Sequence, residues 1–350
     1  METFESLVRA EFSPKNTFLN TASSGLLPAR TVAALHEAVA IRAEGRPMDP
    51  LFEDVEAARA SFARLASVPA GRVAAGPSVA AQTGLVAASL PSGAEVLTAE
   101  GDFTSVINPF HTRGDLKVRA VPLERLAESV RPGTALVAVS AAQSADGRIT
   151  DLPALREAAR AHGARTYVDF SQAAGWLPMD AGAYDFTVST AFKWLLGPHG
   201  AAFLVVPEDF GDLIPLLAGW VAAESPWDSC YGPVTELAHS ARRFDVSPAL
   251  FTYAGLRHSL ALIEELGVAA VHAHDLALAD RFRAGLASLG HAPLPAPGSA
   301  IVSVPGLGER QGEVSRAGIE VSDRAGNLRA SFHLYNTEAD VDRLLDVLAG

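Results

Sequence analysis

Short apolar runs alternate with helical patterns between residues 55 and 206. Most of these runs are mainly apolar rather than alternating apolar and polar, as expected of strands that helices cover on both faces. We expect six strands: Val96–Ala99, Val118–Val121, Ala135–Ser140, Thr166–Phe170, Phe186–Ser189 and Ala202–Val206. We expect four helices: Val55–Ala66, Ala80–Leu90, Leu123–Val130 and Leu152–His162. The alternation favours an α/β fold, with a mostly parallel sheet covered by helices on both faces.

The pattern changes after residue 206. An irregular stretch, Leu213–Pro233, precedes two long helical patterns over Pro248–Leu266 and Val268–Leu289. The tail then predicts three strands and two helices: Ala300–Val304, Ile319–Val321, Leu328–Phe332, Arg310–Ala317 and Glu338–Leu348. We therefore expect a large domain over residues 1–245 and a smaller C-terminal α+β domain over residues 246–350, with the first long helix bridging them.

Composition narrows the class of protein. Of the 350 residues, 49% are hydrophobic and 19% are charged, which is ordinary for a globular chain. The net charge of −12, without a basic run, argues against nucleic-acid binding. No apolar stretch is long enough for a membrane span, and METFESLVRA lacks the features of a signal peptide. The single cysteine, Cys230, excludes an internal disulfide. We expect a cytoplasmic protein without a metal site.

One lysine stands apart from the other basic residues. Only three of the 28 basic residues are lysines: Lys15, Lys117 and Lys193. The first two lie in polar surroundings, whereas Lys193 lies in the apolar segment STAFKWLLGPHGAAFLVV. Taken alone, Lys193 could extend its amine to solvent from a strand end. Its neighbours in the expected sheet decide between that interpretation and a chemical role.

Polar and aromatic side chains follow several of the expected strands. Asp169 ends one strand and Gln172 follows it, while Thr190 and Lys193 follow the next strand. Phe103 comes shortly after Val96–Ala99. Because ligands bind at the carboxyl ends of parallel strands, we expect these side chains to meet at one edge. Individually, Asp169 could cap a helix and Phe103 could be a core residue.

This combination is what pyridoxal phosphate chemistry requires. The cofactor needs a lysine amine for a Schiff base and a carboxylate that keeps its pyridine nitrogen protonated. It also needs a donor for the ring oxygen, a flat group on the ring face, and hydroxyls with a helix N-terminus for the phosphate. The candidates, in that order, are Lys193, Asp169, Gln172, Phe103, and Thr190 with Ser78.

Five segments, in this order, resemble the class V aminotransferases, which are fold type I pyridoxal phosphate enzymes. They are FLNTASSGLLPARTV, AAGPSVAAQTGLVAASL, VSAAQSADGRITDLPAL, YVDFSQAAGWLPMDAGAYDFTVSTAFKWLLGPHGAAFLVV and LRASFHLYNTEADVDRLLDVL. That group includes cysteine desulfurases, selenocysteine lyases and kynureninases. The resemblance spans residues 18 to 348 in collinear order.

The resemblance implies roles for individual residues around the cofactor. Lys193 corresponds to the Schiff-base lysine and Asp169 to the partner of the pyridine nitrogen. Gln172 corresponds to the contact to the ring oxygen, and Phe103 lies where the family has a stacking ring. The resemblance further implies a phosphate site formed by Thr190, Ser78, the backbone of Val79, and Ser247. In the alignment, Ser247 falls near the position of a threonine that, in relatives, reaches the phosphate bound by the partner subunit.

On the substrate side, the resemblance implies that Arg329 grips a carboxylate, a task suited to the guanidinium fork. Taken alone, Arg329 could instead form a surface ion pair. Asn20 is expected nearby, and Ser144 stands where the family usually has an asparagine. Cysteine desulfurases carry a cysteine shortly before this arginine, whereas this chain reads EVSDRAGNLR there. Phe192 replaces the histidine often found before the lysine.

Taken together, these features predict a pyridoxal phosphate-dependent aminotransferase that acts on an amino acid or small amine, as a homodimer like its relatives. The missing cysteine counts against desulfuration but leaves a C–S lyase or β-eliminase as an alternative. A non-catalytic subunit that keeps only the fold is a further alternative. Retention of Lys193, Asp169 and Arg329 together argues against that last interpretation.

Overall fold

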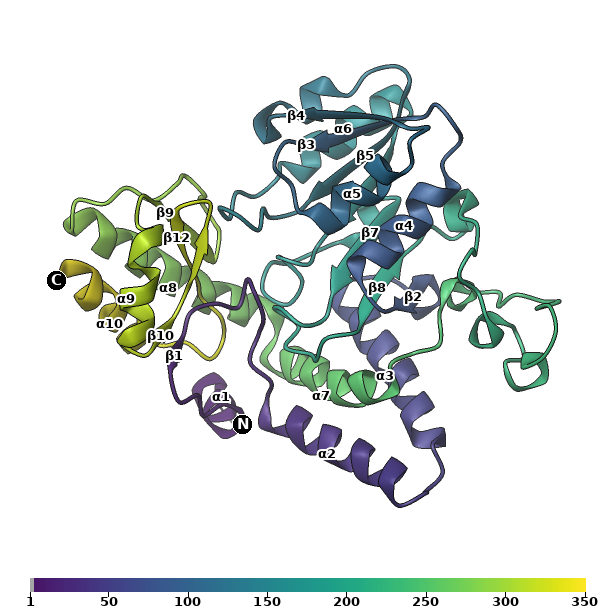
Figure 1. The fold of residues 1–350 in the computed structure, drawn as a ribbon, viewed down its shortest axis with the longest axis horizontal. Helices are drawn as coiled ribbons and strands as arrows, with labels where there is room; N and C mark the ends of the chain where they lie inside the picture. Colours follow the sequence, from purple (N-terminus) through teal and green to yellow (C-terminus); the bar gives the residue numbers. More distant parts are fainter. Residues whose placement is uncertain (1–2) are drawn as a thin grey trace.

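A seven-stranded sheet forms the larger lobe of the protein, and the computed structural model describes it with the rest of residues 3–350 (Figure 1). The strand order is β2–β8–β7–β6–β5–β3–β4. The strands are β2 (Val73–Gly76), β3 (Glu95–Ala99), β4 (Lys117–Val121), β5 (Thr134–Ser140), β6 (Arg165–Asp169), β7 (Phe186–Thr190) and β8 (Ala202–Val205). Only β8 runs against its neighbours. The mostly parallel sheet is confirmed.

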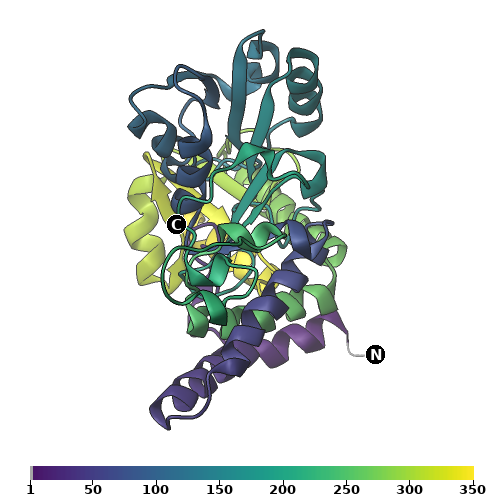
Figure 2. The same cartoon turned by 90° about the vertical axis from the view of Figure 1, so that its right-hand side faces the viewer.

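Helices cover both faces of this sheet. The covering helices are α3 (Asp49–Leu65), α4 (Val79–Ser89), α5 (Thr104–Thr112), α6 (Leu152–His162) and α7 (Leu250–Leu266). Successive strand residues point to opposite faces, so Ala74 and Leu204 pack with α4 and α5. Ala75 and Val205 pack with α3 and α7 instead. Val137 packs with α6. Figure 2 shows the sheet between its helical layers.

The smaller lobe combines a three-stranded antiparallel sheet with helices. Its elements are α8 (Val268–Ser288), β9 (Ile301–Pro305), α9 (Gln311–Arg316), β10 (Ile319–Glu320), β11 (Ser322–Arg324), β12 (Asn327–Ser331) and α10 (Glu338–Ala349). The first elements of the chain are α1 (Phe4–Glu11), β1 (Thr17–Phe18) and α2 (Ala29–Ala43). Strand β1 pairs with β10, which places the N-terminal segment against the smaller lobe. The domain boundary near residue 245 stays a prediction.

Two kinds of difference separate the expected from the observed elements. The helix expected over Leu123–Val130 is wrong, because that segment forms two short 3₁₀ turns that bury Leu126 and Val130. Strand β2 was not expected, since its sequence VAAG has little strand propensity. Helix α5 was also not expected, because it contains Pro109. Within residues 3–350, no helix has the length and apolar character needed to cross a bilayer.

A fully buried acid–imidazole pair in the smaller lobe orients a histidine that contacts the larger lobe. His333 Nδ1 lies 2.9 Å from Asp275 Oδ2 on α8, and neither side chain is exposed. His333 Nε2 lies 3.0 Å from the carbonyl oxygen of Trp194, in the segment that carries Lys193. A carbonyl oxygen can only accept, so Nε2 carries a hydrogen and one further proton is shared between Nδ1 and the carboxyl group. The smaller lobe thereby contacts the lysine segment directly.

We expect Asp275→Ala to destabilise the protein strongly, because it leaves the buried imidazole without its partner. Breaking a buried pair typically costs about 3–5 kcal/mol. Asp280→Ala on the same helix is the matched control, since Asp280 makes an exposed ion pair with Arg283 at 2.9 Å and should contribute less than about 1 kcal/mol. Thermal unfolding of both variants measures the difference. Equal losses in the two variants would show that the buried pair contributes no more to stability than the exposed carboxylate does.

Candidate active site

The carboxyl ends of five strands lie at one edge of the large sheet. Strand β8 is antiparallel to both β2 and β7, so β2 runs in the same direction as the parallel strands. The loops at this edge carry Ser78 after β2, Phe103 after β3, Ser144 after β5, Gln172 after β6 and Lys193 after β7. The structure therefore brings the candidate residues from these loops to a common edge, as the strand pattern predicts.

The amine of Lys193 is buried between aromatic rings. The side chain is 5% exposed, and Nζ lies 4.8 Å from the centre of the Phe103 ring and 5.8 Å from that of Phe192. Nζ makes no hydrogen bond or ion pair within residues 3–350. Burial lowers the pKa of Lys193 to about 8, which the charge of Asp169 opposes and that of Arg329 reinforces. A buried, unpaired amine of lowered pKa is suited to act as a nucleophile.

The N-terminal segment packs closely against the lysine loop. Gly25 N donates to the carbonyl oxygen of Phe192 at 2.8 Å. A Cβ atom at Gly25 would lie 2.1 Å from the carbonyl oxygen of Lys193, so no larger residue fits there without movement. This contact fixes the backbone from which the lysine side chain extends.

Asp169 places a buried carboxylate at the end of β6. The residue is 2% exposed, and burial raises its pKa to about 6 although Ser171 N donates to Oδ1 at 2.8 Å. Ser171 Oγ in turn accepts from Thr190 N at 3.0 Å, which ties the ends of β6 and β7 together. The helix-cap interpretation of Asp169 is wrong, because the residue precedes a turn and no helix begins there.

The side chain of Gln172 is fully hydrogen-bonded within the protein. Its Nε2 donates to the carbonyl oxygen of Ala22 at 2.8 Å and to Ser144 Oγ at 2.9 Å. Its Oε1 accepts from Trp194 Nε1 at 2.8 Å. A contact from Gln172 to a bound ring must therefore replace one of these two donor bonds. Trp194 thus contacts both Gln172, through its indole, and His333, through its backbone carbonyl oxygen.

Arg329 is a buried guanidinium without an acidic partner. It is 1% exposed, and its Nη1 donates to Ser144 Oγ at 3.2 Å and to the carbonyl oxygen of the same residue. Nη2 donates to Ser23 Oγ at 2.8 Å, and that hydroxyl donates to Asn20 Oδ1 at 2.7 Å. Nε has no partner within residues 3–350. Burial lowers the pKa of Arg329 to about 9. This geometry excludes the surface ion pair and leaves one buried donor of the guanidinium unsatisfied.

The candidate phosphate residues lie at the other end of the same edge. Ser78 caps α4, and its Oγ accepts from Ala81 N at 3.3 Å, so the backbone of Val79 begins an exposed helix N-terminus. Ser247 and Pro77 line a pocket of about 140 Å³ beside it. Asp245, which accepts from Ala75 N at 2.7 Å, anchors the segment of Ser247 to β2. Helix N-termini attract anionic groups.

Sequence reasoning missed three residues of this site. Asp102 accepts from Ser140 N at 2.8 Å, which holds the loop of Phe103 against β5. Ser23 links Arg329 to Asn20, and Trp194 holds Gln172. Each of these residues lies within three positions of a predicted site residue. A polar or indole side chain so close to a predicted site residue was the sequence feature that could have identified it.

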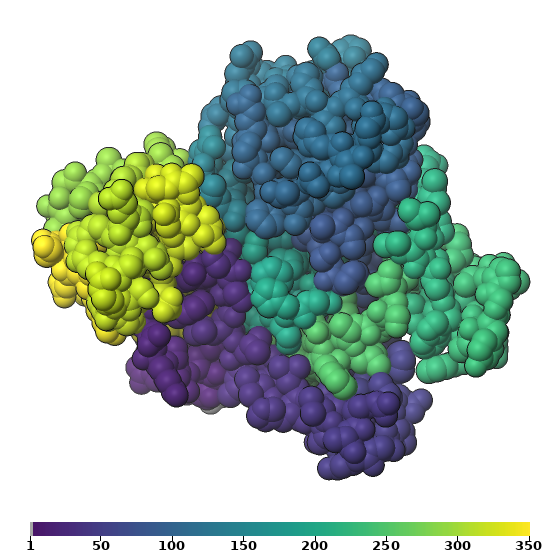
Figure 3. All heavy atoms as spheres, in the orientation of Figure 1, coloured from purple at the N-terminus to yellow at the C-terminus, as the bar shows by residue number. Residues whose placement is uncertain are grey.

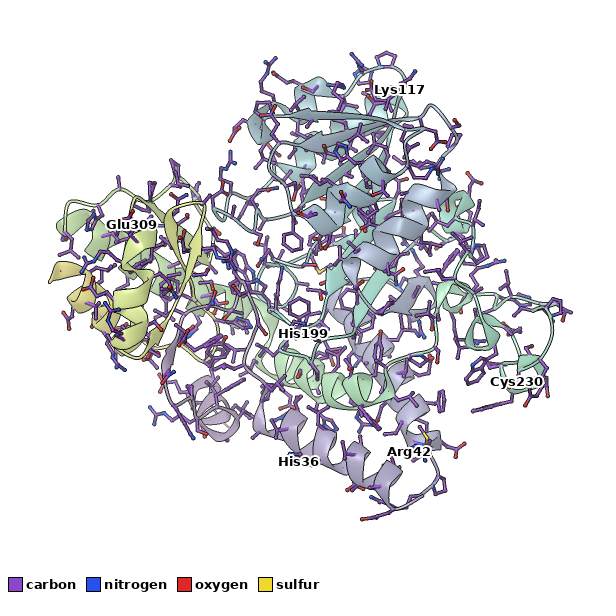
Figure 4. All side chains as sticks on the ribbon, in the orientation of Figure 1. His36, Arg42, Lys117, His199, Cys230 and Glu309 are labelled. Atoms are coloured by element: carbon purple, nitrogen blue, oxygen red, sulfur yellow. The ribbon has the colours of Figure 1, made fainter. Side chains whose placement is uncertain are left out.

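The single cysteine lies away from the lysine segment. Figure 4 places Cys230 on the outermost loop at the right, whereas His199 lies near the centre of the molecule. The His199 ring stacks on Phe192, next to Lys193, with 3.8 Å between ring centres. In Figure 3 the loop of Cys230 lies at the right-hand edge, opposite the smaller lobe at the left. The chain therefore places no thiol of its own beside the buried amine.

We expect Lys193→Met to stabilise the cofactor-free protein near neutral pH. The pKa of Lys193 is about 8 in the folded chain, against an ordinary value of 10.5. The unfolded chain therefore binds this proton more tightly, and protonation destabilises the fold by about 3 kcal/mol below pH 8. The gain from the substitution should shrink as the pH rises from 8 to 10.5.

Thermal unfolding of the cofactor-free proteins between pH 7 and pH 10.5 measures this effect, with Lys117→Met on the exposed face of β4 as the control for loss of an amine. A gain that stays constant over this range, or a loss at pH 7, would contradict the assignment of a buried amine with a lowered pKa.

Comparison with known proteins places this geometry in a family. The family described as Aminotransferase class-V matches residues 18–344. An isopenicillin N epimerase of Streptomyces clavuligerus is 31% identical, over 97% of this chain and 96% of its own. The uncharacterized aminotransferase YcbU of Bacillus subtilis is 27% identical, over 85% of this chain and 84% of its own. The cystine C–S lyase C-DES, solved with cysteine persulfide, superposes with a TM-score of 0.87 at 24% identity, over 96% and 97%. This chain belongs to the class-V aminotransferase family.

Proposed function

We propose that this chain is a pyridoxal phosphate-dependent aminotransferase that acts on an amino acid or small amine through Lys193. The observation that carries the proposal is the buried, unpaired amine of Lys193, whose pKa is lowered to about 8, beside the buried carboxylate of Asp169. The residues present fit the cofactor, because a lysine side chain that is 5% exposed lies over the Phe103 ring and is accompanied by the 2% exposed carboxylate of Asp169. An amine near its pKa at neutral pH can both attack a carbonyl group and move a proton.

Each side chain has a defined task in this proposal. When bound, pyridoxal phosphate supplies an electron sink for the carbanion that forms at the substrate Cα. Lys193 would hold the cofactor through its amine, and the same amine would move the proton at the substrate Cα. Asp169 holds the proton of the pyridine nitrogen, and Phe103 covers the ring face. Ser78, Val79, Thr190 and Ser247 bind the phosphate.

Arg329 orients the substrate. A carboxylate that binds Nε would fill the one buried donor of Arg329 that lacks a partner. Ser144 and Ser23 hold the guanidinium plane in place, and Asn20 lies behind Ser23. Binding the carboxylate at a fixed distance from Lys193 sets which Cα bond is aligned for cleavage.

We further propose a homodimer. Ser247 and Ser78 are both exposed in the single chain, beside the pocket at the start of α4. The surface on that side also exposes large apolar side chains, among them Leu216, Trp227 and Tyr231. Exposed apolar side chains of this size are typical of an interface. A second copy that covers them would also enclose the phosphate end of the site.

Epimerisation is a second candidate, because the 31% identity to isopenicillin N epimerase extends over 97% of this chain. Both reactions begin with proton removal at Cα, and they differ in where the proton returns. A C–S lyase or β-eliminase is the remaining alternative, and the absence of a cysteine beside the lysine argues only against persulfide formation on the protein.

We expect cofactor-loaded protein to convert a reactive amino acid, without an acceptor, to one equivalent of 2-oxo acid per subunit. Added 2-oxo acid should then restore turnover. Lys193→Ala should lower the rate at least about 100-fold, since positioned proton transfer contributes that much. Lys117→Ala is the control. Mass spectrometry of products formed in deuterated water distinguishes the reactions.

Other products would overturn the aminotransferase proposal in a defined way. Deuterium at Cα without 2-oxo acid would indicate epimerisation. Ammonia with pyruvate, or sulfide, released beyond one equivalent would indicate a lyase. No product and no visible absorption band after reconstitution with the cofactor would indicate a non-catalytic subunit.

We expect Arg329→Gln to lower kcat/KM for amino acids by about 10- to 100-fold, the usual effect of losing a hydrogen bond to a charged group. Primary amines without a carboxylate should be unaffected, because they make no use of the guanidinium. Steady-state kinetics with an amino acid and its decarboxylated amine checks this. An equal loss for both substrates would show that Arg329 has a structural role instead.

A further inference from the structure

A second guanidinium group reaches the serine that holds Arg329. Arg324 Nη2 donates to Ser23 Oγ at 3.0 Å, and Arg329 Nη2 donates to the same atom at 2.8 Å. Ser23 Oγ donates its own hydrogen to Asn20, so both of its acceptor positions are taken by guanidinium groups. Two positive charges therefore lie within a few ångströms of each other.

The position of Arg324 is set by the hairpin between β11 and β12. Ser322 pairs with Arg329 across the two strands, and Arg324 lies two residues further along the same face. The turn consists of Ala325 and Gly326, with φ values of 52° and 80°. Both values are left-handed, as a tight two-residue hairpin requires. Arg324 Nη1 also donates to the carbonyl oxygen of Asp323 at 2.7 Å, which fixes the side chain further.

No acidic side chain compensates the two charges. Within residues 3–350, neither Arg324 nor Arg329 forms an ion pair, and Nε of Arg329 has no partner. The carboxyl group of Asp323 instead accepts from Gly326 N at 2.9 Å. The charge of Arg324 contributes to the lowered pKa values of both Arg329 and Lys193. Mutual repulsion of this kind is unfavourable unless an anion binds.

One carboxylate cannot pair with both Arg329 and Arg324. In the proposed function, Lys193 and Asp169 are both committed to the cofactor, and two guanidinium groups remain. A carboxylate bound by the fork of Arg329 satisfies that group alone. Arg324 keeps donors that no protein atom uses, and it is exposed whereas Arg329 is buried. The second group therefore lies nearer to solvent than the first.

We propose that the substrate is an amino acid with a second acidic group on its side chain. Arg329 binds the α-carboxylate at the buried end, and Arg324 binds the distal acidic group at the exposed end. The proposal rests on the proposed function, because that function places the α-amine at Lys193.

The test compares acids with their amides, which differ in charge but hardly in size. Binding is measured by titration calorimetry on cofactor-loaded protein with L-glutamate and L-glutamine, and with L-aspartate and L-asparagine. In at least one pair the acid should bind at least about tenfold more tightly, equivalent to about 1.4 kcal/mol. The preference should weaken as salt is added, since one of the two charges is exposed.

Arg324→Gln should abolish the preference for the acid and leave the affinity for the amide unchanged. Arg316→Gln, an exposed arginine on α9, is the matched control for the change in net charge and should keep the preference. Arg329→Gln should weaken acid and amide alike, because both carry the α-carboxylate. Equal affinity for acid and amide in the unaltered protein, or an undiminished preference in Arg324→Gln, would overturn the proposal.

Binding measurements on cofactor-free protein distinguish a failure of the two-arginine site from a failure of the proposed function. Glutarate carries two carboxylates but no amine, and its monoamide is the matched control. Glutarate should bind the cofactor-free protein more tightly than the monoamide, and Arg324→Gln should remove the difference. A preference for glutarate would support the two-arginine site even if Lys193 bound no cofactor. If the protein bound the cofactor but had equal affinities for glutarate and its monoamide, only the two-arginine site would be contradicted.

Discussion

Burial of positive charge without matching negative charge is the constraint on which the site depends. Lys193 and Arg329 are both nearly inaccessible to water, and the carboxylate whose charge acts on Lys193 is the buried Asp169. Asp102 nearby is occupied by Ser140. A buried charge lowers stability unless it is paired. Sites that keep such charges usually do so for binding or catalysis, and the remaining fold must supply the lost stability.

The rest of the site holds these charged groups at fixed positions. Trp194 binds Gln172, Gln172 binds Ser144, and Ser144 binds Arg329. This chain of hydrogen bonds leads from the lysine segment of the large sheet to β12 of the smaller lobe. His333 closes it from the other side through the carbonyl oxygen of Trp194. The distance between the amine and the guanidinium is thus set by the packing of two lobes, as precise orientation of a substrate requires.

Much of this arrangement follows from the sequence, for identifiable reasons. Strands such as β5 and β8 contain continuous apolar runs, which mark the sheet. Polar residues that end or follow parallel strands must meet at one edge, so the neighbourhood of Lys193 and Asp169 was predictable. Long-range contacts were not. Ser23 meets Arg329 across some three hundred residues, and no local pattern encodes that contact. That Arg324 lies on the same face as Arg329 follows only from the register of the hairpin between β11 and β12. The unexpected α5 forms despite Pro109 because the sheet packs against it.

Membership in the class-V aminotransferase family leaves the reaction open, and the charges around Lys193 are the basis of the proposal that the substrate is an anionic amine. The proposed function depends on pyridoxal phosphate being held by the amine of Lys193. The most direct measurement is borohydride reduction of the cofactor-loaded protein, followed by proteolysis and mass spectrometry of the peptides. We expect a cofactor-derived mass on the peptide that contains Lys193, and on no peptide with Lys15 or Lys117. Label on either of those lysines, or on none, would contradict it.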